Sequence, residues 1–565
     1  MFLRDWYRFL FVGCIISETL SAWNTDATYV NTPSSVAADP YVRWDIKASL
    51  YYAYSTEGAD EGWFFGLYSS PDLATWTKVP GGAIKNDTAS KLWANDWYWA
   101  PECYFNDKTG WYFLFYAGRM TNQTNVARFF KYPDFEEASK IGVAVSRSPS
   151  GPFTNIEASP IDYYPFDPDY RDVNLIMSPP YYVPPSTQSE GETAPLGTFI
   201  PGIDPDIYFG DENEGMYLFF SRNAYRNWVW DPKYTKYIEE SNIYGVRLDE
   251  AWWNDPEAKT IPTVHPDFRD VNKGKLANWT SAVNGSFPAG PERMDGWVSV
   301  ISRSLQPQIW EDAHVFDYSA SNGALKDRRW SEGSTTIKRS DSNGDAIYFL
   351  TYSANNFESP DYGVGYAYAP SPLGPYFKSN SNPILSQDAS NIYSTGHGSI
   401  VSVPSSAGKE ELYYPHHARP SPDDDRYLYI SRLVINADEL YVEFGSTAGD
   451  LRLPSGSAPF AIKVTSSNGT DYAVTVKNVY GVDMDLGNPA NRVRVLTDGT
   501  EINASTNSNS SSILSLEDVE IGSVLTFRYQ RARSNASEPW LDVQQFQRLI
   551  LAGESWVEVN VTHDS

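Results

Sequence analysis

Four carboxyl groups and one imidazole stand at equivalent places in five similar segments of the chain, namely Asp39, Glu102, Asp204, Glu332 and His397. Each precedes or opens a short apolar run, which leads through a Gly, Asn or Asp turn into a run rich in Tyr and Phe. If the segments converge, the carboxyl groups share one pocket, where like charges resist joint ionisation. One carboxyl group then stays protonated near neutral pH while another is ionised, as general acid–base chemistry requires.

The five segments have the turn chemistry of β-hairpins, and this predicts how the five residues are brought together. Several are followed by an alternating strand with a Ser-Pro turn, as in IGVAVSRSPSGPF from Ile141 and YGVGYAYAPSPLGPY from Tyr362. Five such units without helical periodicity predict an all-β fold, a five-bladed β-propeller. The first strand of every unit would then line the central channel. An ordinary β-sandwich is the alternative.

The repeated pattern stops at about residue 436. The following region has alternating runs such as FAIKVTSS and VLTFRYQR, with Ser/Asn-rich joints such as STNSNSSS. We therefore expect the propeller at residues 23–436 and a C-terminal β-sandwich module at residues 437–565. Such a module either binds carbohydrate or packs on the propeller, and the sequence favours neither.

Residues 1–22, MFLRDWYRFLFVGCIISETLSA, predict a secretory signal peptide. Arg4 and Arg8 flank an apolar run from Phe9 to Ile16, and small residues precede a cleavage point near Ala22. The run is too short to span a bilayer, so we expect a secreted, extracellular protein without membrane association after cleavage. Nine N-x-S/T sequons make it a candidate glycoprotein. Cleavage would leave Cys103 alone, so no disulfide framework is expected.

Composition excludes one class of partner and favours another. The net charge is −27, which makes nucleic acid a poor partner because phosphate binding needs clustered Lys and Arg. Aromatic residues make up 15% of the chain, including 19 Trp, which suits stacking on the flat faces of sugar rings. Trp44, Trp97 and Trp99 are candidates for such stacking, and Glu102 is expected to hydrogen-bond in the pocket wall.

The order and spacing of these motifs resemble glycoside hydrolase family 43 over about residues 36–420. The resemblance is carried by ADP at Asp39, WAPE at Glu102, IDPDIYF at Asp204, SEGS at Glu332 and GHGSI at His397. It implies an inverting five-bladed propeller that acts on arabinans, arabinoxylans or xylans, or in some members on galactans. One departure is Ser334, which follows the glycine of SEGS where the family often has Pro.

The resemblance also implies a role for each matched residue. Asp39 matches the general base, Glu332 the general acid, and Asp204 the carboxylate that raises the pKa of the acid and orients it. Asp206 is the nearest rival to Asp204, since alternation would place both on one face. His397 matches a histidine near the propeller axis that in some members helps to hold a calcium ion or ordered water. A structural calcium is therefore an open expectation, and no other cofactor is required.

These observations predict a secreted glycoside hydrolase that acts on plant cell-wall polysaccharides or oligosaccharides. It would cleave arabinofuranosyl, or else xylosyl, linkages with inversion, and a β-xylosidase of the same family is the close alternative. A retaining, invertase-like fructosidase is a second alternative, to which Glu102 and Cys103 give a superficial match. A non-catalytic, carbohydrate-binding propeller is the third.

Overall fold

Strands make up most of the secondary structure of the computed structural model, which confirms the prediction of an all-β fold. The structure describes most of residues 28–560, and the predicted signal peptide lies outside the described residues. Gaps of five or more residues within this range are 30–34, 131–136, 162–200, 223–227, 267–297, 405–409, 444–450, 453–458, 479–490, 533–539 and 550–557. The chain divides into a larger unit, Thr28–Val403 with Glu410–Pro454, and a smaller one that contains Ser455–Ser565.

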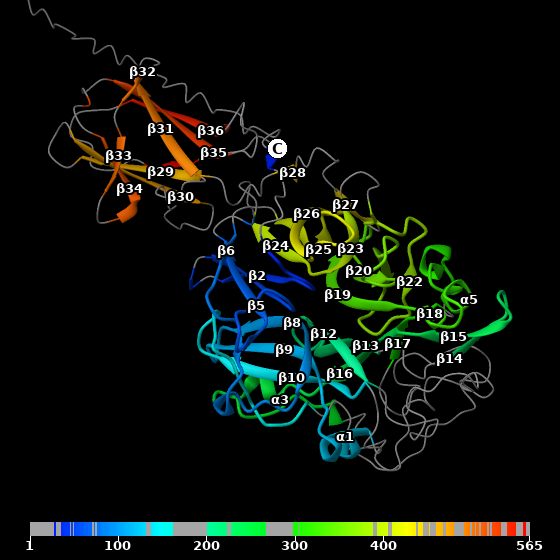
Figure 1. Ribbon diagram of the computed structural model, residues 1–565. Coiled ribbons are helices and arrows are strands. Elements are labelled where there is room, and N and C mark those ends of the chain that lie inside the picture. Colours follow the sequence, from blue (N-terminus) through cyan, green and yellow to red (C-terminus); the bar gives the residue numbers. More distant parts are fainter. Residues whose placement is uncertain are drawn as a thin grey trace, which may run out of the picture. The chain divides into compact units, whose positions relative to one another are not determined.

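Within the described residues, the larger unit contains five antiparallel sheets, each built on four strands that are consecutive or nearly so in the sequence. The first and second sheets consist of β2 (Tyr41–Asp45), β3 (Leu50–Ser55), β5 (Gly66–Ser70) and β6 (Thr77–Lys78), and of β8 (Asp96–Asn106), β9 (Trp111–Arg119), β10 (Ser139–Ser146) and β11 (Thr154–Asn155). The third and fourth consist of β12 (Gly202–Phe209), β13 (Met216–Arg222), β16 (Asn242–Leu248) and β17 (Val298–Ile301), and of β19 (Ser331–Ser340), β20 (Ala346–Ala354), β21 (Gly363–Ala369) and β22 (Phe377–Lys378). The fifth consists of β23 (Tyr393–Gly398), β25 (Glu410–Arg419), β26 (Tyr427–Asn436) and β27 (Glu439–Glu443), and β24 (Val401–Pro404) also pairs with β25. Figure 1 shows them following one another from blue to yellow.

The first strands of the five sheets lie beside one another in sequence order. β2 contacts β8, β8 contacts β12, β12 contacts β19, and β19 contacts β23. The Ser399 hydroxyl joins the last segment to the first, because it accepts the Val42 N–H and donates to the Pro40 carbonyl, both at 3.1 Å. The starts of all five first strands are thereby brought to one place, although they are hundreds of residues apart.

The first strands are irregular at the points where the signature residues stand. β12 shifts register between Ile203 and Asp206, and β19 shifts between Glu332 and Thr335. The backbone φ angle is positive at Asp39 (50°), Asp204 (52°), Gly333 (59°) and His397 (42°). Such bulges re-aim side chains away from strict alternation, and positive φ values in residues other than glycine cluster at functional sites. At Gly333 a Cβ atom would lie 2.8 Å from the His397 ring, so only glycine fits there.

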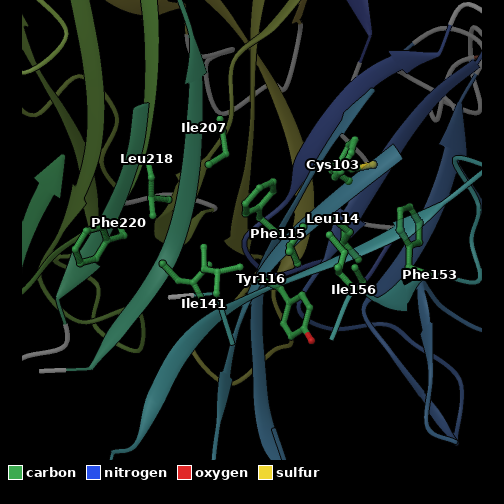
Figure 2. Packing of buried hydrophobic residues seen from close by; sticks show 14 of the residues in the cluster. Cys103, Leu114, Phe115, Tyr116, Ile141, Phe153, Ile156, Ile207, Leu218 and Phe220 are labelled. Atoms are coloured by element: carbon green, nitrogen blue, oxygen red, sulfur yellow. The ribbon is translucent and has the colours of Figure 1, made fainter. Parts of the chain in front are cut away.

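Large aromatic and aliphatic side chains fill the space between neighbouring sheets. Figure 2 shows part of one cluster, in which Leu114 of β9 and Ile141 of β10 belong to the second sheet, and Ile207 of β12 and Leu218 of β13 belong to the third. Cys103 of β8 is buried in the same cluster as a free thiol, and burial raises its pKa to about 11. It is therefore a core residue and not a reactive cysteine.

A side sheet adjoins the third and fourth sheets. It consists of β14 (Trp228–Asp231), β15 (Lys236–Glu240) and β18 (Arg328–Arg329), with β18 running parallel to β15. The remaining short elements are β1 (Thr28–Tyr29) with β28 (Leu451–Arg452), β4 (Trp63–Phe64) with β7 (Ile84–Lys85), the helices α1 (Gln123–Phe130), α3 (Ala251–Asn254) and α5 (Asp317–Ala320), and the 3-10 turns η1 (Thr88–Ser90) and η4 (Ile309–Asp312). Among the described residues, no helix has the length and apolar character needed to cross a membrane.

The smaller unit contains two antiparallel sheets. One is formed by β29 (Pro459–Ser466), β30 (Tyr472–Asn478), β33 (Ala504–Asn507), β34 (Ser510–Leu516) and β37 (Glu558–Asn560), and the other by β31 (Asn491–Thr497), β32 (Thr500–Glu501), β35 (Val524–Ala532) and β36 (Trp540–Leu549). Val474 and Leu516 of the first sheet share a buried cluster with Val495 and Phe527 of the second. The units divide at residues 454 and 455, later than the expected boundary after residue 436, because β27 still pairs with β26.

Candidate active site

The structure brings four of the five signature residues to one cavity. Asp39, Asp204, Glu332 and His397 line a cavity of about 310 Å³, together with Trp99. They come from four different first-strand segments of the larger unit. The volume lies within the range of pockets that bind small molecules, and its carboxyl groups are the polar groups expected of a reactive site.

Asp39 is held as an ionised carboxylate. Its Oδ1 atom lies 3.1 Å from Arg426 Nη1, 3.2 Å from His397 Nδ1 and 3.3 Å from His417 Nδ1. Burial alone would raise the pKa of Asp39, but Arg426 and then His397 outweigh burial and hold this pKa well below 3.8. Three groups thus crowd Oδ1, which leaves Oδ2 as the oxygen better placed to take a proton.

Thr56 sets the orientation of the Asp39 carboxylate. Its hydroxyl accepts the Ala100 N–H at 2.8 Å and donates its single proton to Asp39 Oδ2 at 2.7 Å. Because the hydroxyl is bonded on both sides, the carboxylate plane is fixed relative to the first and second sheets.

Glu332 has the opposite protonation preference. Burial raises its pKa to about 7, and the negative charge of Asp39 adds to this rise. The Tyr362 hydroxyl donates to Glu332 Oε1 at 2.9 Å and only partly offsets the effect of burial. Glu332 is therefore protonated over the acidic range in which Asp39 is ionised.

Asp204 lies close to the backbone of the Glu332 segment. Its Oδ2 atom accepts the Gly333 N–H at 3.2 Å. Burial raises the pKa of Asp204 to about 7, with Glu332 and Asp39 adding to the rise and His397 and Ser221 opposing it. The charge of Glu332 thus helps to raise the pKa of Asp204, and the bond to the Gly333 N–H fixes Asp204 beside the Glu332 segment.

Asp206 does not share this position, contrary to the alternation that would place it on the same face as Asp204. The register shift and the positive φ at Asp204 turn the two side chains apart, and Asp206 does not line the cavity. Burial raises the pKa of Asp206 to about 8. Its charge contributes to the raised pKa of Glu102, for which burial is the larger cause.

Glu102 and His397 border a second, narrow cavity beside the main one, again with Asp39 and Asp204. The Tyr104 hydroxyl donates to Glu102 Oε2, so this carboxyl group belongs to the wall and not to the main cavity. Among the described residues, no group of three or more His, Cys, Asp and Glu side chains is placed to hold a metal ion. A calcium ion at His397 stays a prediction.

The three candidate tryptophans differ in their positions. Trp99 lines the main cavity, and the Trp97 ring stacks on it at 4.7 Å between centroids. The Arg119 guanidinium lies 3.6 Å from the Trp97 ring centroid, so Trp97 supports Trp99 from behind and does not line the cavity. Trp44 packs against Tyr51 at 4.8 Å and also lies outside this cavity.

Sequence reasoning missed several residues that line the cavity. The most prominent are Arg426, Trp330 and Phe357. Trp330 could have been found from its place two residues before Glu332, since alternating residues of a strand share a face. Arg426 carries no such signal, because it reaches Asp39 across 387 positions of the sequence.

Comparison with known proteins identifies relatives of part of the chain. A protein of Aspergillus niger named β-D-galactofuranosidase xynD is 32% identical over 153 residues, which is 26% of this chain and 40% of that protein. A crystal structure of a thermostable family-43 glycoside hydrolase is 25% identical, with 74% of this chain and 96% of that chain covered and a TM-score of 0.46. An endo-1,4-β-xylanase from Bacteroides thetaiotaomicron is 22% identical, with 75% and 98% covered and a TM-score of 0.44.

The family model described as glycosyl hydrolases family 43 matches residues 307–441. This range contains Glu332, His397 and Arg426, three of the residues that line the cavity. The part of the chain that carries Glu332, His397 and Arg426 therefore belongs to glycosyl hydrolases family 43.

Proposed function

We propose that the protein is a glycoside hydrolase that inverts the configuration of the anomeric carbon. The observation that carries this proposal is the opposite protonation of two carboxyl groups in one cavity, with the pKa of Asp39 held low and that of Glu332 raised to about 7. Such a pair supplies a base and an acid at the same pH. The five sheets would form the blades of a propeller, with the site where their first strands begin.

In this mechanism Asp39 Oδ2 takes a proton from water while the water oxygen bonds to the anomeric carbon. Glu332 gives its proton to the glycosidic oxygen as the bond from carbon to that oxygen breaks. The products are a free sugar of inverted configuration and an alcohol, and solvent resets both carboxyl groups. Inversion requires a separation of about 6.5–9.5 Å between the two carboxyl groups, so that water fits between them. Asp204 orients the Glu332 segment by accepting the Gly333 N–H, and once ionised it favours the protonated form of Glu332.

The proposed substrate is a furanosyl residue at the end of a cell-wall glycan. The sequence motifs favour an arabinofuranosyl linkage, and the Aspergillus niger relative is named for a galactofuranosyl substrate. Arabinofuranose and galactofuranose are both five-membered rings, and this shared ring form is the basis for proposing a furanosyl substrate. A xylosyl linkage is the second candidate, because the family resemblance of the sequence motifs leaves it open. The secretory signal peptide that the sequence of residues 1–22 predicts supports a site of action outside the cell.

The test is proton NMR of the first product formed from aryl α-L-arabinofuranoside, β-D-galactofuranoside and β-D-xyloside, and from sucrose. We expect an inverted product from a furanoside, lost in Glu332→Gln and in Asp39→Asn but kept in the control Glu212→Gln on an exposed turn. A retained product would overturn the proposed pair. Turnover of sucrose would favour a fructosidase, and no turnover with intact binding would favour a carbohydrate-binding protein.

A further inference from the structure

The segment from Arg328 to Glu332 alternates between the cavity and the interior. Arg328, Trp330 and Glu332 all line the cavity. Between them, Arg329 is only 3% exposed and Ser331 only 5% exposed. Successive side chains of an extended segment point to opposite faces. Trp330, two residues before the proposed acid Glu332, therefore lies on the same face as Glu332.

The buried face of this segment is firmly anchored. Arg329 donates to three carboxylates, to Asp312 at 2.7 Å, Glu240 at 3.0 Å and Asp231 at 2.5 Å. The backbone is fixed as well, since the Ser241 N–H donates to the Arg329 carbonyl at 2.9 Å and its own carbonyl accepts the Ser331 N–H. The side sheet therefore holds the cavity face of the segment in one position.

The Trp330 ring is itself fixed before any ligand arrives. The His314 ring meets it at right angles, with 5.6 Å between centroids, and the Asn355 N–H donates to the Trp330 carbonyl at 3.3 Å. The Arg328 guanidinium lies 5.8 Å from the Trp330 centroid and is ion-paired with Glu239 at 2.7 Å. The ring stays partly exposed, so it offers a preset apolar surface and loses little freedom on binding.

The position of Glu332 indicates which part of a substrate would meet this surface. A general acid must lie within hydrogen-bond reach of the leaving oxygen. The sugar attached to that oxygen therefore extends on the Glu332 side, and the attacking water lies on the Asp39 side. Trp330 is on the same face as Glu332, next to the path of the leaving group.

We propose that Trp330 binds the leaving-group sugar, the ring on the reducing side of the bond that is cleaved. This inference rests on the proposed function and adds a specificity to it. The enzyme would select a glycosyl leaving group over a small alcohol through the apolar contact between this sugar and the Trp330 ring, with the position of the ring set by the Arg329 anchor.

The test compares two substrates that differ only in that sugar, α-1,5-arabinobiose and methyl α-L-arabinofuranoside, or the matching pair of whichever glycoside the wild-type enzyme cleaves. Both leaving groups are alcohols that need the acid, but only the disaccharide reaches Trp330. We expect Trp330→Ala to lower kcat/KM about ten-fold or more on the disaccharide and less than about two-fold on the methyl glycoside. Trp330→Phe should recover part of the loss.

Trp111→Ala is the matched control, because the Trp111 ring lies under Arg147 and its N–H bonds to the Pro256 carbonyl. It should leave the ratio of the two kcat/KM values unchanged. An equal loss on both substrates, in a Trp330→Phe protein with normal thermal unfolding, would overturn the inference, and so would unchanged kinetics on both. No turnover of any glycoside by the wild-type enzyme would instead overturn the proposed function.

Discussion

The Nδ1 atom of His417 accepts the backbone N–H of Asp39 at 3.1 Å, across 378 positions of the sequence. His417 is fully buried on β25, and burial lowers its pKa to about 3, so the ring is neutral and able to accept. Asp39 has a φ of 50°, which costs energy unless its surroundings hold it. The fifth sheet therefore fixes the backbone of the proposed base Asp39, which lies just before the first strand of the first sheet.

Replacing His417 with Leu is expected to impair catalysis more than binding. The Asp39 N–H would lose its acceptor, and the carboxylate would move relative to the attacking water. We expect kcat to fall by up to about a hundred-fold, with KM nearly unchanged, because small displacements of a catalytic group have such effects. His417→Asn keeps an acceptor near the position of Nδ1 and should recover part of kcat in steady-state kinetics.

His416 provides the matched control for this experiment. It is the next residue on the same strand, equally buried, and bonds to Thr395 and Ser431 instead of Asp39. His416→Leu should lower thermal stability without a specific loss of kcat in the protein that remains folded. If both variants lose kcat alike, His417 has a general structural role and does not position Asp39.

The pH profile of kcat/KM should have its alkaline limb near pH 7. Glu332 acts as an acid only while protonated, and its pKa is raised to about 7 by burial and then by Asp39. The acidic limb should lie below pH 3.8, where Asp39 begins to take up a proton. Glu332→Gln should abolish the alkaline limb on an activated aryl glycoside, whose leaving group needs no acid. Persistence of that limb would show that another group sets it.

Removing the charge of Arg426 should move the acidic limb to higher pH. The Arg426 guanidinium helps to lower the pKa of Asp39, so its loss in Arg426→Gln raises that pKa, and the base is protonated at a higher pH. Arg419→Gln, on the neighbouring strand with its guanidinium on the Asp424 carbonyl, is the control. An unshifted acidic limb in Arg426→Gln would contradict the assignment of Asp39 as the base.

The stability of the fold should be greatest at mildly acidic pH. Burial raises the pKa of both Asp204 and Glu332 to about 7, so the stability they contribute is complete below about pH 4 and is lost as the pH rises through 7. Asp39 acts in the opposite direction, since its lowered pKa makes its contribution fall away below pH 3.8.

Thermal unfolding followed across pH 3–8 would check this expectation. Asp204→Asn removes one of the two groups that must ionise in the buried site, so it should flatten the decline between pH 4 and 7. A decline as steep as in the wild-type protein would show that other groups, and not Asp204, cause it.

Arg329→Met should strongly destabilise the larger unit. It would leave Asp231, Glu240 and Asp312 without their shared cation in the interior, and such losses cost about 3–5 kcal/mol. The control Arg339→Met removes a pair with Glu410 that is partly exposed, and should cost less than about 1 kcal/mol. Urea unfolding of both variants compares the two losses. Equal losses would show that the Arg329 network adds little to the anchor of Trp330.

Short-range patterns were enough to locate the hairpins and to group Asp39, Asp204, Glu332 and His397. Alternation and turn residues act within a few positions, and the repetition of one pattern in five units aligns equivalent residues whatever their distance in sequence. The family resemblance assigned their roles from the same motifs. The all-β class is confirmed, and the family is confirmed for residues 307–441, while the roles remain proposals.

Other features depended on contacts between distant segments and on local departures from regular geometry. A bulge with positive φ separates Asp204 from Asp206, although alternation alone would place them together. Arg426 and His417 reach Asp39 only because the fifth sheet lies against the first strand, and the Arg329 network presents Trp330 beside Glu332. The sequence by itself determined which residues recur, because recurrence is local. The tertiary structure alone decided which of them are ionised, since burial and neighbouring charge arise only when the sheets meet.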